Sequence, residues 1–207
     1  MKEKLLTTKN LVLMGMFGAL AAVLMLFEFP LVFIAPSFYG LDFSEVPVLV
    51  GAFSMGPAAG VIIEFVKILM KLVMKPTTTG FVGEMANFAI GCSLVVPAAM
   101  IYHTKKSKKS AIYGMIVGTI VMAAAGVVIN AVVMLPFYSK VMPLESIIAL
   151  GAAINPAVSN VWSFAAICVG PFNVVKGVLV SIVTSLVYKR ISNLIHSISR
   201  EQKRGRK

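Results

Sequence analysis

The sequence predicts an all-α protein: an integral membrane bundle of six transmembrane helices whose N- and C-termini lie in the cytoplasm. The chain has 207 residues and a mean hydropathy of +0.92. Only 13% of its residues are charged, about half the share usual in a soluble domain. Three runs, 10–27, 110–139 and 146–175, hold no charged residue and are long enough to cross a bilayer. We therefore expect one membrane domain, 1–207, without a second, soluble domain.

The distribution of basic residues sets the expected orientation. The net charge is +11, which by itself could indicate a nucleic-acid partner. The lysines and arginines gather, however, in short segments beside apolar runs, at 2–9, 105–109 and 189–207. That pattern is typical of cytoplasmic loops under the positive-inside rule. It argues against nucleic-acid binding and indicates that the chain is surrounded by membrane lipids.

The expected spans follow from the apolar runs and from the charges between them. They are residues 11–27, 44–55, 57–74, 84–102, 111–135 and 171–188. The outer loops are then 28–43, 75–83 and 136–170.

The stretch 44–74 could be one span followed by a basic helix, or a hairpin broken at Gly56-Pro57. One span would leave the 105–109 cluster outside, whereas two spans return it to the cytoplasm, where positive charge is preferred. We therefore expect the hairpin. Its first arm is only about 18 Å long at about 1.5 Å per residue. Because a bilayer core is thicker than that, the arm must be tilted, extended or shielded by neighbouring helices.

The last span is expected to begin at Pro171, a favourable first helical position. The preceding segment 146–170 is apolar enough to cross, but another crossing would place the basic C-terminal segment outside. This segment also contains Asn155-Pro156, Asn160 and Trp162, which suit an outer loop that lies on the protein.

The last span carries the most informative pair of polar residues, Asn173 and Lys176. Their i, i+3 spacing puts an amide and an ammonium on one helix face, where they could together hold a polar small molecule. A charge in a span is costly and by default marks a functional site. The plainer alternative is that Lys176 snorkels to the interface or pairs with a carboxylate.

Candidate binding residues from four segments are expected to meet at the outer end of the bundle. The loop 28–43, the starts of the fourth and sixth spans and the end of the fifth all lie there. Together they contribute Tyr39, Leu41, Gly83, Glu84, Asn87, Asn130, Asn173 and Lys176. The sequence thus predicts a binding site that faces outward.

Some of these polar residues have a plainer alternative. Glu84 could simply favour the N-terminus of its helix, and Asn87 could bond to a neighbouring helix instead of a ligand. On the third span, Glu64 and Lys67 are expected to form a helix-face ion pair, with Lys71 snorkelling outward. Lys71 could instead contribute charge to the mouth of the site.

The first span carries a stripe of small residues in two small-xxx-small pairs. They are Gly15, Gly18, Ala19 and Ala22. Such stripes let helices approach closely. This small-residue stripe could pack within the bundle, or it could form a lipid-facing patch that docks a partner membrane protein.

The sequence indicates neither a catalytic site nor a metal site. Cys92 and Cys168 lie in apolar surroundings without metal-type spacing, and His103 and His196 lie near basic, peripheral segments. The chain has no Gly-x-Ser-x-Gly motif and no His-Glu-x-x-His motif. An intramembrane enzyme is therefore a poor fit.

Two segments stand out as specific motifs, Asp42-Phe43-Ser44-Glu45-Val46-Pro47 and Pro171-Phe172-Asn173-Val174-Val175-Lys176-Gly177. Others are Gly56-Pro57-Ala58-Ala59-Gly60, Gly83-Glu84, Ala86-Asn87-Phe88 and Leu135-Pro136-Phe137-Tyr138. With these segments the chain, from its first span to its last, resembles the substrate-binding S components of energy-coupling factor (ECF) vitamin transporters, specifically the riboflavin-specific ones.

This resemblance implies a six-helix bundle in the bacterial plasma membrane, with a vitamin pocket near the outer surface. Asn130, Asn173 and Lys176 would bind the polar edge or the ribityl hydroxyls of a flavin, and the backbone around Leu41 and Gly83 would contact the rest. Riboflavin, or flavin mononucleotide (FMN), would be the transported ligand, with no resident cofactor. The small-residue stripe would dock a transmembrane coupling subunit (T component), which acts with two cytoplasmic ATPases.

The residues are compatible with these implications. The chain has no Gly-x-x-x-x-Gly-Lys-Ser/Thr phosphate loop, so ATP hydrolysis must come from partners. Aromatic side chains that could stack on a flavin are Phe38, Tyr39, Phe81, Phe88 and Trp162. The alternatives are another vitamin, such as thiamin or folate, and a stand-alone carrier. Lys176 would oppose the cationic thiamin unless a carboxylate such as Glu84 dominated.

Overall fold

Helices account for most of the computed structural model, which describes the backbone of residues 7–204 and the side chains of residues 7–188. The long helices are α1 (Thr8–Leu26), α3 (Pro57–Met74), α4 (Val82–Lys105), α5 (Lys108–Ile129) and α9 (Gly170–Arg204). The shorter ones are α2 (Glu45–Met55), α6 (Leu135–Tyr138), α7 (Leu144–Ala152) and α8 (Val161–Phe164). Two π-helical segments, η1 (Asn130–Met134) and η2 (Ala165–Val169), join α5 to α6 and α8 to α9.

Hydroxyl side chains begin two of the long helices. Thr7 accepts a hydrogen bond from the backbone N–H of Asn10 at 3.3 Å, and Ser107 accepts one from that of Ser110 at 3.1 Å. Each bond satisfies an N–H group that the first turn of a helix leaves unpaired. The turn between α4 and α5 is correspondingly short, with Lys106 in the left-handed conformation at φ 47°.

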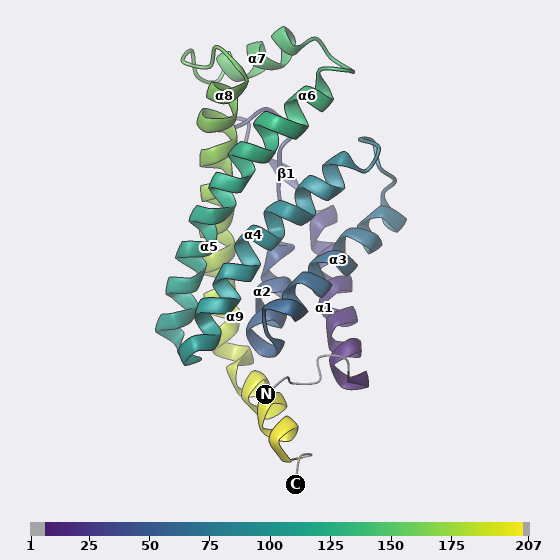
Figure 1. Ribbon diagram of the computed structural model, residues 1–207, viewed down its shortest axis with the longest axis vertical. Helices are drawn as coiled ribbons and strands as arrows, with labels where there is room; N and C mark the ends of the chain where they lie inside the picture. Colours follow the sequence, from purple (N-terminus) through teal and green to yellow (C-terminus); the bar gives the residue numbers. More distant parts are fainter. Residues whose placement is uncertain (1–6, 205–207) are drawn as a thin grey trace.

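Figure 1 shows which elements share each end of the bundle. The start of α1, the turn between α4 and α5 and the end of α9 lie at the lower end. Helix α7 and the loop between α3 and α4 lie at the upper end. The basic segment 105–109 therefore lies at the end of the bundle opposite to α7 and the α3–α4 loop.

The hairpin of α2 and α3 turns at Gly56, as the sequence predicts. Gly56 has φ 108° and ψ 167°, a combination that glycine alone adopts without strain. Pro57 then occupies the first turn of α3. Of the 11 residues of α2, all but Ser54 are buried, so neighbouring helices shield this short arm.

Within the described residues, four helical stretches are long and apolar enough to cross a membrane. They are Thr8–Leu26, Val82–Lys105, Lys108–Tyr138 and Val161–Tyr188. Helix α2 is shorter, and α3 carries Glu64, Lys67 and Lys71 within its apolar sequence. The six-span count and the cytoplasmic position of the termini therefore stay predictions.

The last membrane helix begins ten residues before Pro171, the start that the sequence predicted. Its first residue is Val161, and the side chain of Asn160 accepts a hydrogen bond from the N–H of Ser163 at 2.9 Å. Pro171 has no N–H to donate to the preceding turn, and the wider turn of η2 carries the helix past it. The same arrangement occurs where η1 precedes Pro136.

The described residues are mostly helical, as the sequence predicts, and the expected outer loop 136–170 is itself partly helical. The loop contains α7, whose Ile147 is buried, and also the start of the last helix. A two-residue antiparallel pair of strands, β1 (Phe29–Pro30) and β2 (Gly40–Leu41), closes the loop after α1. Strands of two residues are too short to leave a periodic pattern in a sequence.

Two apolar clusters lie along the bundle. The first contains buried residues of all the helices from α1 through α5 and of α9, such as Leu49, Phe53 and Met122. The other contains Leu41 and Phe172, together with buried residues of α7 and α8. This second cluster attaches the loop after α1 to the last helix and so positions the residues of the site.

Candidate functional site

A cavity of about 250 Å³ lies among the loops that follow α1 and α3, helices α4 and α9, and η1. Small-molecule pockets usually measure about 300–1,000 Å³, so the cavity suits a compact organic molecule. Its wall combines carboxylates, ammonium groups, amides, hydroxyls and aromatic rings.

All but one of the predicted binding residues line this cavity. They are Tyr39, Gly83, Glu84, Asn87, Asn130, Asn173 and Lys176. The exception is Leu41, whose side chain is fully buried in the apolar cluster with Phe172. Its neighbours Gly40 and Asp42 line the cavity instead, because successive residues of an extended segment point in opposite directions.

Lys176 in the cavity wall pairs with Asp42 of the loop after α1. Lys176 Nζ lies 2.8 Å from Asp42 Oδ2, and both side chains are buried. Asp42 Oδ1 also accepts a hydrogen bond from the backbone N–H of Ser44 at 2.8 Å. The alternative that Lys176 pairs with a carboxylate is therefore confirmed. Lys176 nevertheless lines the cavity.

This pairing controls the ionisation of Asp42. Burial opposes the charge, but the charges of Lys176 and Lys67 and the hydrogen bonds from Lys176 and Ser44 outweigh it, so the pKa of Asp42 lies below its ordinary 3.8. A carboxyl whose folded-state pKa is lowered stabilises the fold above its ordinary pKa, and this contribution is lost as the pH falls through the lowered value. At neutral pH the Asp42 carboxyl is ionised.

Hydrogen bonds hold three of the predicted side chains in place. Tyr39 donates its hydroxyl to Asn130 Oδ1 at 2.8 Å, and Asn130 Nδ2 donates to the carbonyl of Gly126 at 2.8 Å. Asn173 Nδ2 donates to the carbonyl of Val169 at 3.0 Å. An amide offers two donors and two acceptor positions, so these bonds leave capacity on both asparagines for a ligand.

Tyr39 is a hydroxyl donor at any physiological pH. Burial raises the pKa of Tyr39 above its ordinary 10.0, and the nearby Tyr138 and Cys168 raise it a little further.

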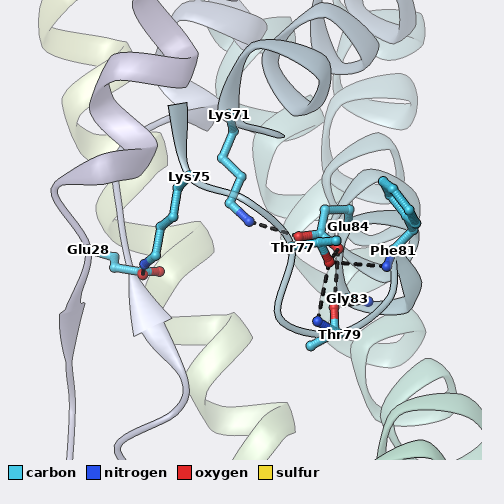
Figure 2. A network of polar contacts seen from close by, with 8 residues as sticks. All are labelled: Glu28, Lys71, Lys75, Thr77, Thr79, Phe81, Gly83 and Glu84. Carbon is cyan, nitrogen blue, oxygen red and sulfur yellow. Dashed lines mark hydrogen bonds and ion pairs between the residues drawn. The ribbon is translucent and has the colours of Figure 1, made fainter. Parts of the chain in front are cut away.

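Glu84 is the centre of a network that ties the α3–α4 loop to the start of α4 (Figure 2). Its Oε1 accepts a hydrogen bond from Lys71 Nζ at 2.8 Å, and its Oε2 accepts from the hydroxyls of Thr77 and Thr79 at 2.9 and 3.1 Å. Thr79 in turn accepts the N–H of Gly83 at 3.0 Å. The expected outward snorkelling of Lys71 is wrong, because its ammonium turns to Glu84 and lines the cavity.

A second pair, Glu28 with Lys75, was missed at the sequence level. Lys75 Nζ lies 2.9 Å from Glu28 Oε1, and both side chains are about half exposed (Figure 2). The cavity lining therefore contains three carboxylates, each paired with a different lining ammonium group. The wall carries no net charge.

Aromatic rings lie beside the amides in the cavity wall. Tyr39 and Phe172 have ring centroids 5.7 Å apart, and Phe38 and Tyr138 have centroids 5.8 Å apart. All four residues line the cavity. Offset and tilted rings of this kind present flat apolar surface next to polar groups.

The other aromatic residues expected to stack on a ligand do not line the cavity. Phe81 and Trp162 are 58% and 56% exposed, and Phe88 packs edge-on against Phe65. Phe81 has a left-handed backbone, with φ 71°, at the point where α4 begins.

The ion pair expected between Glu64 and Lys67 is confirmed, but neither residue lines the cavity. Lys67 pairs in addition with Glu45 of α2, with 2.7 Å between Nζ and Oε1. All three side chains are buried. This charged group therefore joins α2 to α3 inside the bundle.

One family is similar to the chain over nearly its full length. The sequence model for the "ECF transporter, substrate-specific component" family matches residues 9–188. The chain belongs to this family.

Several proteins similar to this ECF component have names that agree with one another. A Staphylococcus aureus protein named riboflavin transporter RibU is 36% identical over 92% of this chain and 94% of its own length. A Bacillus subtilis protein named riboflavin transporter FmnP is 30% identical over 88% of this chain and 92% of its own length. A solved structure, described as the S component of a bacterial ECF transporter, matches with a TM-score of 0.70 at 36% identity and covers 90% of this chain and 97% of that one. The chain is thus a multi-pass component of a bacterial membrane transporter.

The small-residue stripe of this ECF component divides in two. Gly18 and Ala22 are buried, and a Cβ at Gly18 would collide with Val66 of α3. That half serves packing within the bundle, which is the plainer of the two expectations. Gly15 and Ala19 are partly exposed, and no atom lies within 4 Å of a Cβ placed on Gly15.

Replacing Asp42 with Asn should destabilise this ECF component by about 3–5 kcal/mol, because Lys176 would stay buried without a counter-charge. Unfolding in detergent at pH 7 measures the loss. The double variant Asp42→Asn/Lys176→Met should recover most of it, since the uncompensated ammonium is then gone. Losses that simply add in the double variant would show that the two residues do not act as a pair.

Proposed function

We propose that this ECF component binds riboflavin at the outer end of the bundle and serves as the substrate-binding subunit of a transporter that takes it up. One observation carries the proposal: two buried amides, Asn130 and Asn173, and the ammonium of Lys176 converge with aromatic rings on one cavity. The names of the S. aureus and B. subtilis relatives support the same ligand.

The chemistry of the wall suits a flavin. The isoalloxazine ring system is flat, with an apolar dimethylbenzene end and a pyrimidine edge that offers both donors and acceptors. The amides of Asn130 and Asn173 can satisfy both kinds. Tyr39 and Phe172 can pack against the ring system, and Lys176 can donate to a carbonyl or ribityl oxygen while it keeps its bond to Asp42.

The charge balance of the wall favours an uncharged ligand. Each lining ammonium group already has a lining carboxylate as its partner. Riboflavin is uncharged at neutral pH, whereas FMN and folate are anions and thiamin is a cation. A charged ligand would have to break an existing pair or stay uncompensated. Riboflavin is therefore the first choice, ahead of FMN, thiamin and folate.

Riboflavin binding and its dependence on Asn173 test this function. The ligand-free chain should quench riboflavin fluorescence saturably, and FMN, thiamin and folate should compete more weakly. Asn173→Ala should weaken binding by about 1–3 kcal/mol, the cost of a lost buried hydrogen bond. Ser146→Ala on the exposed side of α7 is the control and should bind as the wild type does. A chain that binds no flavin would overturn the proposal.

We also propose that six helices cross the membrane and that both termini are cytoplasmic. The basic segment 105–109 at the lower end supports this orientation. In a background without Cys92 and Cys168, a cysteine in place of Ser146 should react with a membrane-impermeant maleimide on intact cells. A cysteine in place of Lys109 should react only after the membrane is opened. The reverse labelling pattern would contradict the orientation.

For uptake we propose a complex with a transmembrane coupling subunit and two cytoplasmic ATPases. The missing phosphate loop and the membership in a family of transporter components support such partners. The partly exposed Gly15 and Ala19 are the proposed contact with the coupling subunit, since small residues let helices approach closely. A stand-alone carrier would instead transport without ATPases.

Ala19→Leu should leave riboflavin binding unchanged but lower complex assembly and uptake, because the added side chain would hold the coupling subunit away. Co-purification and uptake in cells that contain the partners measure both effects. Ala22→Leu is the matched control: Ala22 is fully buried, so the change should lower the stability of the isolated chain. Normal assembly and uptake in the Ala19 variant would exclude this docking surface.

A further inference from the structure

A group of buried charges separate from the cavity lining joins α2 to α3. Lys67 Nζ lies 2.7 Å from Glu45 Oε1 and also forms an ion pair with Glu64. Lys67 and Glu64 are fully buried, and Glu45 is only 2% exposed. One ammonium group thus faces two carboxyl groups in an apolar interior.

The two glutamates have more oxygen atoms than their surroundings satisfy. Glu45 Oε2 and Glu64 Oε2 are buried without a hydrogen-bond partner, and Glu64 Oε1 has only its ion pair with Lys67. The two carboxyl groups lie next to each other, because Oε1 of each contacts Lys67 Nζ and both face Gly91 of α4, where a Cβ would collide with Glu64. Two ionised carboxylates cannot bond to each other, because both are acceptors only. A proton on one of them would supply the missing donor.

The charges of the connected groups lead to the same conclusion. Lys67 Nζ also reaches Ser44 Oγ at 3.4 Å, and the N–H of Ser44 bonds to Asp42, the partner of Lys176. If every group were ionised, this chain of contacts would hold three carboxylates and two ammonium groups, a net charge of −1. An uncompensated charge inside a membrane bundle is strongly unfavourable. One bound proton brings the net charge to zero.

Among the residues whose side chains the structure describes, neighbouring elements do not supply the missing positive charge. On α4 the titratable group that faces the glutamates is the thiol of Cys92, which carries no charge when protonated. The described part of α1 has a single charged residue, Lys9, in its first turn. On α9 the nearby ammonium of Lys176 is held by Asp42, and farther along α3 Lys71 is held by Glu84.

A metal ion is a poorer candidate than a proton. Among the described residues, no group of three or more histidine, cysteine, aspartate and glutamate side chains could hold one. Neither glutamate lines the cavity, and Gly91 packs directly against Glu64. A proton needs no such volume and no further ligands.

We propose that Glu45 and Glu64 form a proton-binding site that holds one proton at neutral pH, shared between their carboxyl groups. Lys67 forms an ion pair with both glutamates, so the proton belongs to the two carboxyl groups together. The proton forms an O–H···O hydrogen bond between the two glutamates. This site lies outside the cavity, so its existence does not rest on riboflavin as the ligand.

Infrared spectroscopy of the full chain in lipid at pH 7, without ligand, tests the proposal. The wild type should show the carbonyl stretch of a protonated carboxylic acid, with a shift in D₂O and loss of the band as the pH is raised. The band should be absent from Glu64→Gln and from Glu45→Gln, because the remaining glutamate then ionises against Lys67. Glu145→Gln, an exposed position on α7, should keep it. A wild-type spectrum without this band, or a band that survives both single substitutions, would overturn the proposal.

Thermal unfolding tests the charge balance by a separate measurement. Either single glutamine variant keeps the group neutral and should unfold near the wild-type temperature. The double variant Glu45→Gln/Glu64→Gln leaves Lys67 without a carboxylate and should unfold at a clearly lower temperature. Because the folded pair binds a proton that the unfolded chain releases, wild-type stability should fall as the pH rises, more steeply than in either single variant. Equal pH dependence of stability in the wild type and both single variants would contradict the shared proton. So would a double variant as stable as the single variants.

Discussion

The need to neutralise charge inside an apolar bundle is the constraint on which the rest of the structure depends. Water cannot screen an ammonium group there, so a lysine is tolerated only with a carboxylate beside it. The partners come from separate segments: Lys176 and Asp42 are 134 residues apart, and Lys71 and Glu84 are 13 apart. The first pair therefore fastens a loop to α9, and the second joins α3 to α4. The contacts that balance charge are the same contacts that shape the cavity.

Features that depend on composition and local sequence could be predicted. Long uncharged runs indicated the membrane class, and Gly56-Pro57 indicated the α2–α3 hairpin that the structure contains. The meeting of Asn130 with Asn173 and Lys176 followed from counting helices and assigning ends to them. These inferences needed only helix direction and did not require the orientation of any side chain.

Features that depend on contacts distant in sequence could not be predicted. A helical pattern relates Lys71 only to residues of its own helix, so its bond to Glu84 on the next helix was invisible. Whether Leu41 or Asp42 faces the cavity is decided by a pair of strands only two residues long. Pro171 is compatible with a helix start and also with a helix interior that a π-helical turn has widened, and only that turn distinguishes the two.

The two π-helical segments have a consequence for the evolution of this binding wall. Each precedes a proline, and each lies beside an asparagine of the cavity: Asn130 begins η1, and Asn173 follows η2 within one turn. A π-helical turn holds an extra residue within an α-helix, so the loss of one residue would restore ordinary α-helix and change which side chains of that turn face the cavity. Single-residue gaps between relatives at 130–134 or 165–169 would therefore reshape the wall around Asn130 or Asn173 as well as shorten the helix.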